Sequence, residues 1–262
     1  MPKFNSKNED ITYKHNRIVR VISHYKNGDY CTGTGFLINK NGNILTCWHV
    51  ISGVDLKILK NMSKFQEDKS TSEIDKVNKY FLDKTSKIEI ELSNGTKAGA
   101  TLESYDYYYD IAVLKIDERA KKLPFFELEL GESLDYSDET LFCGYPSCLG
   151  YDSLNSPFAV NTGIVSTFPE VEIAGGKYRN IQLNSICLGG NSGAPLFKKG
   201  SNKVCGIVNG YYYQEVKNIA VYKEDGTFKK DSYRITINIS YATSFYRLMK
   251  ESKIFKQLMN KA

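Results

Sequence analysis

Residues 188–196 read LGGNSGAPL, a glycine-rich turn that leads directly into an apolar run. Ser192 lies in this turn between Asn191 and Gly193, a setting in which several classes of enzyme present a nucleophilic serine. A serine hydroxyl is a weak nucleophile by itself, so it needs a neighbouring base and a third group that orients the base. The turn therefore predicts a catalytic site only if the chain also supplies these two groups.

Two other segments supply a base and an acid. His49 lies near the end of the apolar run ILTCWHV at residues 44–50, and Asp110 begins the run DIAVLK at residues 110–115. The order His, Asp, Ser along the chain is that of chymotrypsin, whereas subtilisin and the α/β-hydrolases use other orders. We therefore expect a serine endopeptidase in which His49 accepts the proton of Ser192 and Asp110 orients His49. Asp106 is a nearby alternative for the acid.

The glycines around Ser192 predict an oxyanion hole. Without a Cβ, they allow the backbone to turn so that amide groups converge on the oxygen that becomes negatively charged during the reaction. The turn formed by Gly190, Asn191 and Ser192 would make this hole, and the expected donors are the amides of Gly190 and Ser192.

Composition and charge argue against several other classes of protein. The 262 residues carry 35 Lys and Arg against 30 Asp and Glu, a net charge of +5, and these charges are dispersed along the chain. Nucleic-acid binding calls for a clustered basic patch, so it is not expected. No stretch reaches the roughly 18–20 apolar residues of a membrane-spanning helix.

The six cysteines and the N-terminus bear on the cellular compartment. No two cysteines are spaced as a CxxC pair, and no Cys/His cluster along the sequence is typical of a zinc site. Several cysteines lie inside apolar runs, where a reduced cysteine behaves as a small hydrophobic residue. The first ten residues contain no apolar run typical of a secretory signal. We therefore expect reduced thiols, no metal and a cytoplasmic location.

Short strands joined by tight turns predict an all-β fold. Asn-Gly or Asp-Gly steps lie between apolar runs at residues 41–42, 94–95 and 225–226, which is the strongest short-range signal for a β-hairpin. Two segments break this pattern. Residues 56–87 are polar and rich in lysine, with a helix expected over 71–82 from a capping box at Ser70 and Glu73. Residues 243–259 have the apolar stripe of an amphipathic helix expected to pack on a barrel.

Five blocks of the sequence together identify a family resemblance. The chain resembles trypsin-like proteases of the chymotrypsin superfamily, and within it the HtrA/DegP type without a PDZ domain, in the blocks GTGFLI (33–38), ILTCWHV (44–50), YDIAVLKID (109–117), NTGIVS (161–166) and GNSGAPL (190–196). The resemblance implies one protease domain over residues 1–262 with two six-stranded antiparallel barrels, and it implies no metal or organic cofactor. The first barrel would span about 17–120 with the insertion 56–87, the second about 121–242, and a C-terminal helix 243–262.

Departures from the family pattern refine this expectation. Asn191 replaces the aspartate that in digestive trypsins pairs with a newly cut N-terminus, so we expect activity without zymogen cleavage. By resemblance, the primary specificity pocket would be formed by Ile186 at its base and by Cys187, Val208, Asn209, Gly210 and Ala242. Since no acid lies at the base, we expect a small or medium apolar side chain before the scissile bond rather than Lys or Arg.

The insertions 56–87 and 211–234 leave the regulation open. They are either surface elaborations, which loops tolerate readily, or elements that cover the cleft or receive a regulatory partner. The expected partners are therefore a protein or peptide substrate and a regulatory protein or effector. The alternative to an enzyme is a catalytically silent protein that keeps the same fold as a binding module or scaffold.

Overall fold

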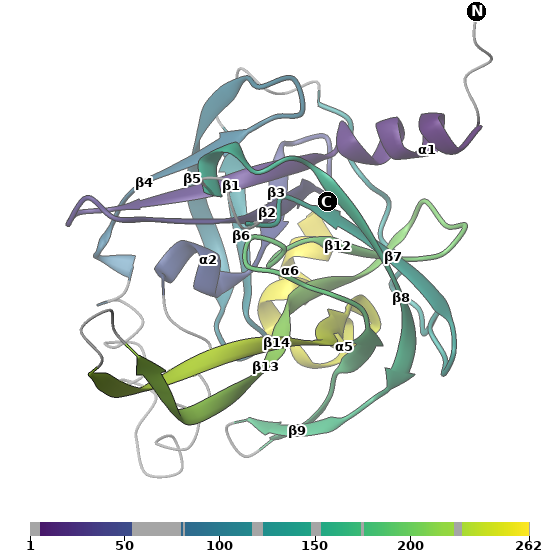
Figure 1. Ribbon diagram of the computed structural model, residues 1–262. Coiled ribbons are helices and arrows are strands. Elements are labelled where there is room, and N and C mark those ends of the chain that lie inside the picture. Colours follow the sequence, from purple (N-terminus) through teal and green to yellow (C-terminus); the bar gives the residue numbers. More distant parts are fainter. Residues whose placement is uncertain are drawn as a thin grey trace, which may run out of the picture.

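Two barrels make up the body of the molecule (Figure 1). The computed structural model describes residues 6–53, 80, 82–116, 123–147, 153–173, 176–222 and 227–261. Each barrel is closed, has six strands, and pairs its neighbouring strands antiparallel. The predicted all-β fold with two six-stranded barrels is confirmed.

The first barrel has the strand order β1-β2-β3-β6-β5-β4. Gly42 and Gly95 both have a φ of +78° and form the turns at the first two predicted Asn-Gly steps, because this conformation is readily adopted only by glycine. The strands are β1 (Ile18–Tyr25), β2 (Tyr30–Leu37), β3 (Asn43–Thr46), β4 (Thr85–Glu91), β5 (Lys97–Asp106) and β6 (Ile111–Ile116). Since β4 begins at Thr85, the polar insertion ends before the predicted residue 87. Most of the helix predicted over 71–82 lies outside the described residues.

The second barrel has the strand order β11-β14-β13-β12-β7-β8. The third predicted hairpin joins its two longest strands, although the Asp-Gly step itself lies outside the described residues. The strands are β7 (Glu139–Gly144), β8 (Ala159–Thr167), β11 (Ile181–Asn184), β12 (Pro195–Lys198), β13 (Val204–Tyr222) and β14 (Phe228–Ser244). A separate two-stranded sheet pairs β9 (Glu170–Ile173) with β10 (Gly176–Arg179).

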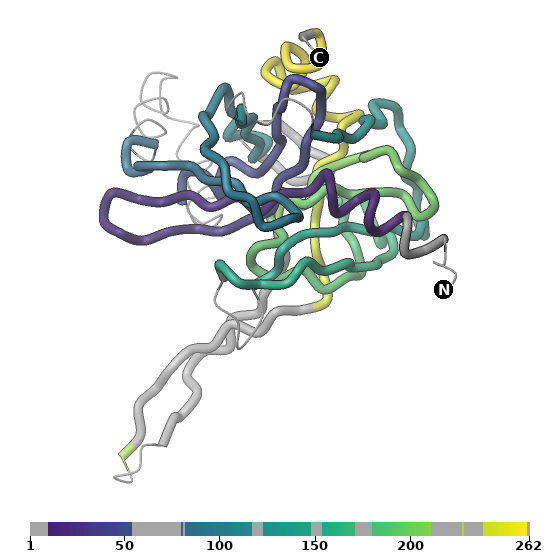
Figure 2. The backbone as a smooth tube through the Cα atoms, turned by 90° about the horizontal axis from the view of Figure 1, so that it is seen from above, coloured from purple at the N-terminus to yellow at the C-terminus, as the bar shows by residue number. Residues whose placement is uncertain are grey.

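Helices flank the barrels. The sequence did not predict α1 (Ser6–His15), and α2 (Trp48–Ser52) carries the predicted base. The single predicted C-terminal helix is two helices, α5 (Phe245–Glu251) and α6 (Lys253–Lys261), drawn in yellow in Figure 2. A 3₁₀ turn, η3 (Ser153–Asn155), precedes β8.

Ser252 causes the break between the two C-terminal helices. Its amide closes α5 by donating to Leu248 O at 2.9 Å, and its hydroxyl accepts the Phe255 amide of α6 at 3.1 Å. Serine is a favourable residue at such a helix start, because its oxygen satisfies an amide that the helix cannot.

The C-terminal helices return to the first barrel. Phe245, Leu248 and Phe255 are buried in the same apolar core as the strands of that barrel. The ring of Phe245 lies 6.3 Å from that of Phe36 on β2 and 5.2 Å from that of Phe255. The helices thus tie the end of the second barrel to the first, as expected for docking onto a barrel. Within the described residues, no helix has both the length and the apolar character needed to cross a bilayer.

Candidate active site

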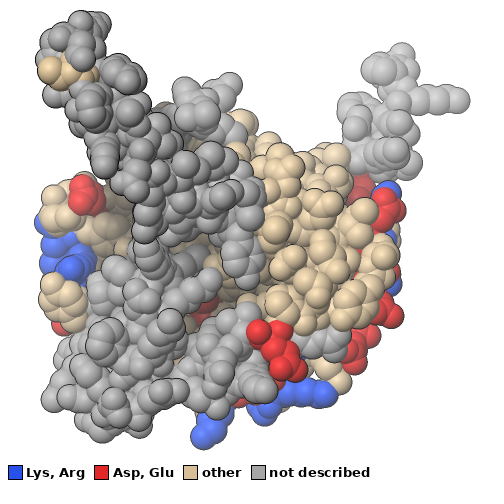
Figure 3. Space-filling view, turned by 60° about the horizontal axis from the view of Figure 1, so that its bottom comes forward, with Lys and Arg blue, Asp and Glu red and all other residues tan. Residues whose placement is uncertain are grey.

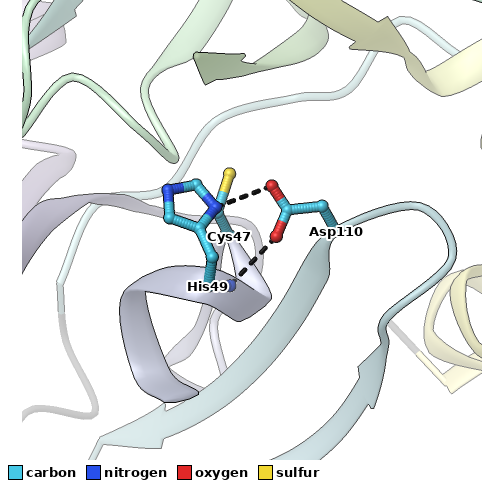
Figure 4. Close-up of side chains that lie close together, drawn as sticks. All are labelled: Cys47, His49 and Asp110. Atoms are coloured by element: carbon cyan, nitrogen blue, oxygen red, sulfur yellow. Dashed lines mark hydrogen bonds and ion pairs between the residues drawn. The ribbon is translucent and has the colours of Figure 1, made fainter. Parts of the chain in front are cut away.

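Asp110 holds His49 at two points (Figure 4). Its Oδ1 accepts the His49 backbone amide at 3.0 Å, and its Oδ2 lies 2.7 Å from His49 Nδ1. The Asp110 carbonyl accepts the Trp48 amide at 3.3 Å, which joins the start of β6 to α2. An imidazole that donates from Nδ1 keeps Nε2 free to accept a proton, which is the form that a general base requires.

Asp110 adopts a backbone conformation that is uncommon for a residue with a side chain. The φ of Asp110 is 52°, in the left-handed region, and the residue is largely buried. Such conformations cost about 1–3 kcal/mol and persist where surrounding contacts impose them, which is typical of functional sites. Here the contacts are those to Trp48 and His49.

The second barrel adds a donor to this carboxylate. Asn209 on β13 directs Nδ2 toward Asp110 Oδ2 at 3.4 Å, and its Oδ1 accepts the Thr243 hydroxyl of β14 at 2.8 Å. Asn209 is 3% exposed. The sequence had predicted Asn209 only as a wall of the specificity pocket, and no local pattern indicates a contact with a residue 99 positions away.

Ser192 lies next to Asn209 from the opposite side. Its hydroxyl donates to the Asn209 carbonyl at 3.4 Å, a long bond, and within the described residues it makes no hydrogen bond to His49. Its own carbonyl accepts the Thr34 amide of β2 at 2.8 Å. Asn209 therefore contacts both the predicted nucleophile and the predicted acid, and the predicted acid holds the predicted base. Catalytic hydrogen bonds are often long before substrate binds.

Two glycines give the predicted oxyanion turn its shape. Gly190 and Gly193 both have a φ of +88°. A Cβ on Gly190 would lie 2.3 Å from the Tyr145 carbonyl oxygen, and one on Gly193 would lie 2.0 Å from that of Thr34. Neither position accepts another residue without moving the backbone. Among the described groups, no acceptor is found for the amides of Gly190 and Ser192.

The first barrel fixes this turn through Thr34. The Thr34 hydroxyl donates to the Gly190 carbonyl at 2.7 Å and accepts the Tyr145 amide at 3.0 Å. The Thr34 side chain is completely buried. One hydroxyl thus joins β2 to the end of β7 and to the glycine-rich turn.

Comparison with known proteins identifies the family. The model of the trypsin-like peptidase domain matches residues 33–207, which is two thirds of the chain. The chain belongs to the trypsin-like peptidase domain family. The predicted family is confirmed, and the match contains all of the segments that carry His49, Asp110 and Ser192.

Relatives and a solved structure agree with this trypsin-like assignment. A probable periplasmic DegP-like serine endoprotease of Rickettsia conorii is 29% identical over 194 residues, 72% of this chain and 30% of the relative. A protein of the same name from Pseudomonas putida W619 is 26% identical over 226 residues, 85% of this chain and 36% of the relative. The active form of the Rv3671c protease from M. tuberculosis has a TM-score of 0.61 at 15% identity, covering 94% of this chain and 83% of that one. The chain spans about a third of the length of these curated relatives, whose names agree with the predicted enzyme class.

The expected cytoplasmic location is wrong by this comparison, because these trypsin-like relatives are named periplasmic proteins. The expectation rested partly on reduced cysteines. Cys31, Cys47, Cys143, Cys187 and Cys205 are indeed unpaired, but all except Cys31 are buried. Burial raises the pKa of Cys143, Cys187 and Cys205 to about 12. A buried, protonated thiol resists oxidation in either compartment, so free cysteines do not indicate one.

Three of the six residues predicted for the specificity pocket contribute to the core of the second barrel. Cys187, Val208 and Ala242 are fully buried there, and Val208 pairs with Ala242 across β13 and β14. Only their backbone is then available to line a pocket. Ile186 is 49% exposed, and Gly210 continues β13 opposite Tyr241. The pocket itself stays a prediction.

The alternative acid, Asp106, has a different partner. Its Oδ2 accepts the Ser252 hydroxyl at 2.6 Å, and Oδ1 accepts the Tyr108 amide at 3.2 Å. Burial raises the pKa of the Asp106 carboxyl, while these hydrogen bonds act in the opposite direction. Asp106 therefore anchors the C-terminal helices to β5. Of the other histidines, His15 stacks on Phe158 at 4.1 Å.

The structure brings together donors that the sequence did not group. Cys47 Sγ, a ring nitrogen of His49 and a carboxylate oxygen of Asp110 all lie within 4.8 Å of one another. Sequence patterns for zinc sites do not detect this set, because Cys47 and His49 are only two residues apart and Asp110 comes from a distant segment. Burial, followed by the charge of Asp110, raises the pKa of Cys47 well above its usual value.

Proposed function

We propose that this chain is a serine endopeptidase with Ser192 as nucleophile, His49 as general base and Asp110 as the orienting acid. The observation that carries the proposal is the two-point hold of Asp110 on His49 beside the Ser192 turn. A carboxylate in this position fixes the tautomer of the imidazole and stabilises its charged form in the transition state.

The chemistry is acyl transfer in two halves. Ser192 Oγ forms a bond with the scissile carbonyl carbon while its proton passes to His49 Nε2, which then gives the proton to the departing amine as the C–N bond breaks. Water repeats the sequence to release the acid and to regenerate Ser192. For the first step the Ser192 hydroxyl leaves the Asn209 carbonyl and turns to His49.

The glycine-rich turn would stabilise the negative oxygen of the intermediate. We assign this role to the turn of Gly190, Asn191 and Ser192, with the amides of Gly190 and Ser192 as donors. Two properties support the assignment: these amides have no described acceptor, and Thr34 restrains the Gly190 carbonyl from the other side. One such donor contributes about 10²–10³ in rate.

Specificity, activation and location follow as parts of the same proposal. Ile186 and the absence of an acid among the predicted pocket residues favour an apolar side chain before the scissile bond. Asn191 is neutral and 1% exposed, so it offers no carboxylate to a newly cut N-terminus, and activity would not require zymogen cleavage. The insertion 56–84 or a partner bound near 211–234 would regulate the site. The names of the relatives favour the periplasm as the compartment.

The surface agrees with a protein or peptide substrate. On the face in Figure 3, the described Lys and Arg side chains lie mainly at the left and lower margins, Asp and Glu lie along the right margin, and the described residues show no concentrated basic patch. Such a distribution favours an extended polypeptide over a polyanion, which calls for a concentrated basic patch.

Labelling with a fluorescent fluorophosphonate tests the proposal. We expect the native protein to be labelled, Ser192→Ala to lose the label completely, and His49→Ala to react at least a hundredfold more slowly. Ser166→Ala, at an exposed serine of β8, is the matched control and should label like the native protein. Labelling that persists in Ser192→Ala would refute the assignment of the nucleophile. Digestion of unfolded casein by the native protein that reacts with the probe would then establish endopeptidase activity.

One observation favours the second candidate, a catalytically silent binding protein. The Ser192 hydroxyl donates to Asn209 and not to His49 among the described residues. If this arrangement is permanent, the folded native protein will resist the fluorophosphonate and will bind peptides without cutting them. Peptide binding without labelling would therefore decide for this candidate.

A further inference from the structure

A cysteine lies beside the proposed catalytic pair, in a position where the mechanism does not use it. Cys47 follows β3 and occupies the N-cap position of α2, two residues before His49, and Asp110 faces both from just before β6 (Figure 4). Cys47 Sγ donates to the Val208 carbonyl at 3.4 Å and lies 3.8 Å from Asn209 Nδ2. The sulfur is thus inside the wall of the site and not in a distant part of the core.

The three donor atoms match the coordination chemistry of zinc. Zinc binds thiolate, imidazole and carboxylate ligands, and a set of three protein ligands leaves a fourth position for water. The donors lie within 4.8 Å of one another, and His49 Nδ1 is 2.7 Å from Asp110 Oδ2. Metal–ligand bonds of about 2.0–2.3 Å place tetrahedral ligands roughly 3.3–3.7 Å apart. Side-chain shifts of about an ångström therefore convert the present arrangement into a coordination shell.

The charges favour a divalent cation. In the metal-free protein the buried Cys47 is a thiol next to the Asp110 carboxylate. When a cation binds, Cys47 loses its proton to solvent and becomes a thiolate, so that two positive charges balance one thiolate and one carboxylate. A buried ion with its charge balanced in this way avoids the large cost of an isolated buried charge.

We propose that Cys47, His49 and Asp110 form an inhibitory binding site for a soft divalent cation, zinc or cadmium. The cation takes the place of the proton on His49 Nδ1, which is released to solvent, while Nε2 takes up a proton from solvent. The imidazole, bound through Nδ1 and protonated at Nε2, then has no free nitrogen to accept the proton of Ser192. Binding of the cation stands on the donor geometry alone, whereas the inhibition rests on the proposed function.

Cadmium provides a direct readout at this site. A cadmium–thiolate bond gives a charge-transfer absorption in the ultraviolet, which requires Cys47 as ligand. The chain has one tryptophan, Trp48, which is fully buried and lies between Cys47 and His49 in the sequence. Its fluorescence should therefore also report the binding of cadmium. We expect one equivalent of cadmium to produce both changes with a single dissociation constant.

Three variants make the experiment specific. Cys47→Ala and Cys47→Ser should lose the charge-transfer band and bind cadmium at least tenfold more weakly. Cys47→Ser keeps the size of the side chain, so it stays informative if the alanine variant does not fold. Trp48 emission like that of the native protein shows that a metal-free variant is folded. Cys205→Ala removes a buried cysteine in the second barrel and should bind cadmium like the native protein. Binding that survives both Cys47 substitutions, or that depends on Cys205, would overturn the site.

Fluorophosphonate labelling during the same titration separates the two proposals. Labelling of Ser192 should fall as the cadmium band rises, and a chelator should restore it. If the band forms but the metal-free protein never labels, the proposed function fails and the metal site stands. If labelling is normal and cadmium produces no band, the metal site fails and the proposed function stands.

Discussion

Replacing Thr34 by valine removes the hydroxyl that joins the first barrel to the glycine-rich turn and keeps the shape of the side chain. In the native protein this hydroxyl donates to the Gly190 carbonyl at 2.7 Å and accepts the Tyr145 amide at 3.0 Å, in a fully buried position. Thr34→Val leaves both of these backbone groups without that partner, and the buried surroundings offer no direct route to water.

The expected cost follows from these two groups. A buried donor or acceptor that loses its partner costs about 1–3 kcal/mol. For the Tyr145 amide and the Gly190 carbonyl together, we expect the free energy of unfolding to fall by about 2–6 kcal/mol. The Gly190 carbonyl would also be free to rotate, which moves the adjacent amides. A small misplacement of catalytic groups costs up to about a hundredfold, so we expect labelling of Ser192 to slow by ten- to a hundredfold.

Urea unfolding followed by Trp48 fluorescence measures the stability, and fluorophosphonate labelling measures the reactivity. Thr34→Ser is the matched control, because it keeps the hydroxyl and loses one methyl group, for which we expect about 1 kcal/mol. It should label within a few-fold of the native rate. If Thr34→Val is as stable and as reactive as Thr34→Ser, the hydroxyl does not hold the turn and the reasoning is refuted.

Three further substitutions test the surroundings of the site. Gly193→Ala places a Cβ 2.0 Å from the Thr34 carbonyl at a φ of +88°, so we expect no labelling, whereas the control Gly200→Ala has a similar φ of +81° with nothing within 4 Å and should label normally. Asn209→Leu removes an amide that donates to the Asp110 carboxylate, so on the proposed function we expect labelling to fall about tenfold and the free energy of unfolding to fall by about 1–3 kcal/mol; unchanged labelling would exclude a role for this amide. For Asp106→Asn, we expect the free energy of unfolding, minus that of the native protein, to increase as the pH rises. Urea unfolding at several pH values measures this difference.

The sign of this last effect follows from the direction of the pKa shift. Burial raises the pKa of Asp106 in the folded protein above the value of about 3.9 expected in the unfolded chain. The folded state therefore holds the proton more tightly. This contribution is fully present below the unfolded pKa and is lost as the pH rises through the folded pKa. Asparagine does not titrate, so a difference between Asp106→Asn and the native protein that stays constant across this range would contradict the expectation.

Much of the fold could be predicted because its determinants are local. Gly42 and Gly95 form tight turns with positive φ exactly where an Asn-Gly step separates two apolar runs, and adjacent strands then pair as hairpins. The proximity of His49 and Asp110 was predicted from their order and from the resemblance. Their mutual geometry depends on the pairing of β3 with β6, which joins segments far apart in the sequence.

Other features lack a local signal. Residues 6–15 form α1 without a strong apolar stripe, and its buried Lys14 is held by Asn202 at 2.8 Å and by Asp10. The family resemblance predicts Asn209 as a pocket wall, and the apolar run around Cys47 predicts a small hydrophobic residue. The contact of Asn209 with Asp110 arises only when the two barrels meet, and the proximity of Cys47 to Asp110 arises only when β3 pairs with β6, so no window of sequence contains the information.

The division of the site between two barrels has a physical consequence. His49 and Asp110 belong to the first barrel and Ser192 to the second, so their relative positions are only as exact as the contacts between the barrels. Thr34 reaches from the first barrel to the glycine-rich turn, and Asn209 reaches back from the second to the carboxylate. These contacts cross the interface in opposite directions at the site itself, so a displacement of one barrel would disturb both at once. Reactivity of Ser192 should therefore report on the fit of the two barrels more sensitively than the folding of either barrel does.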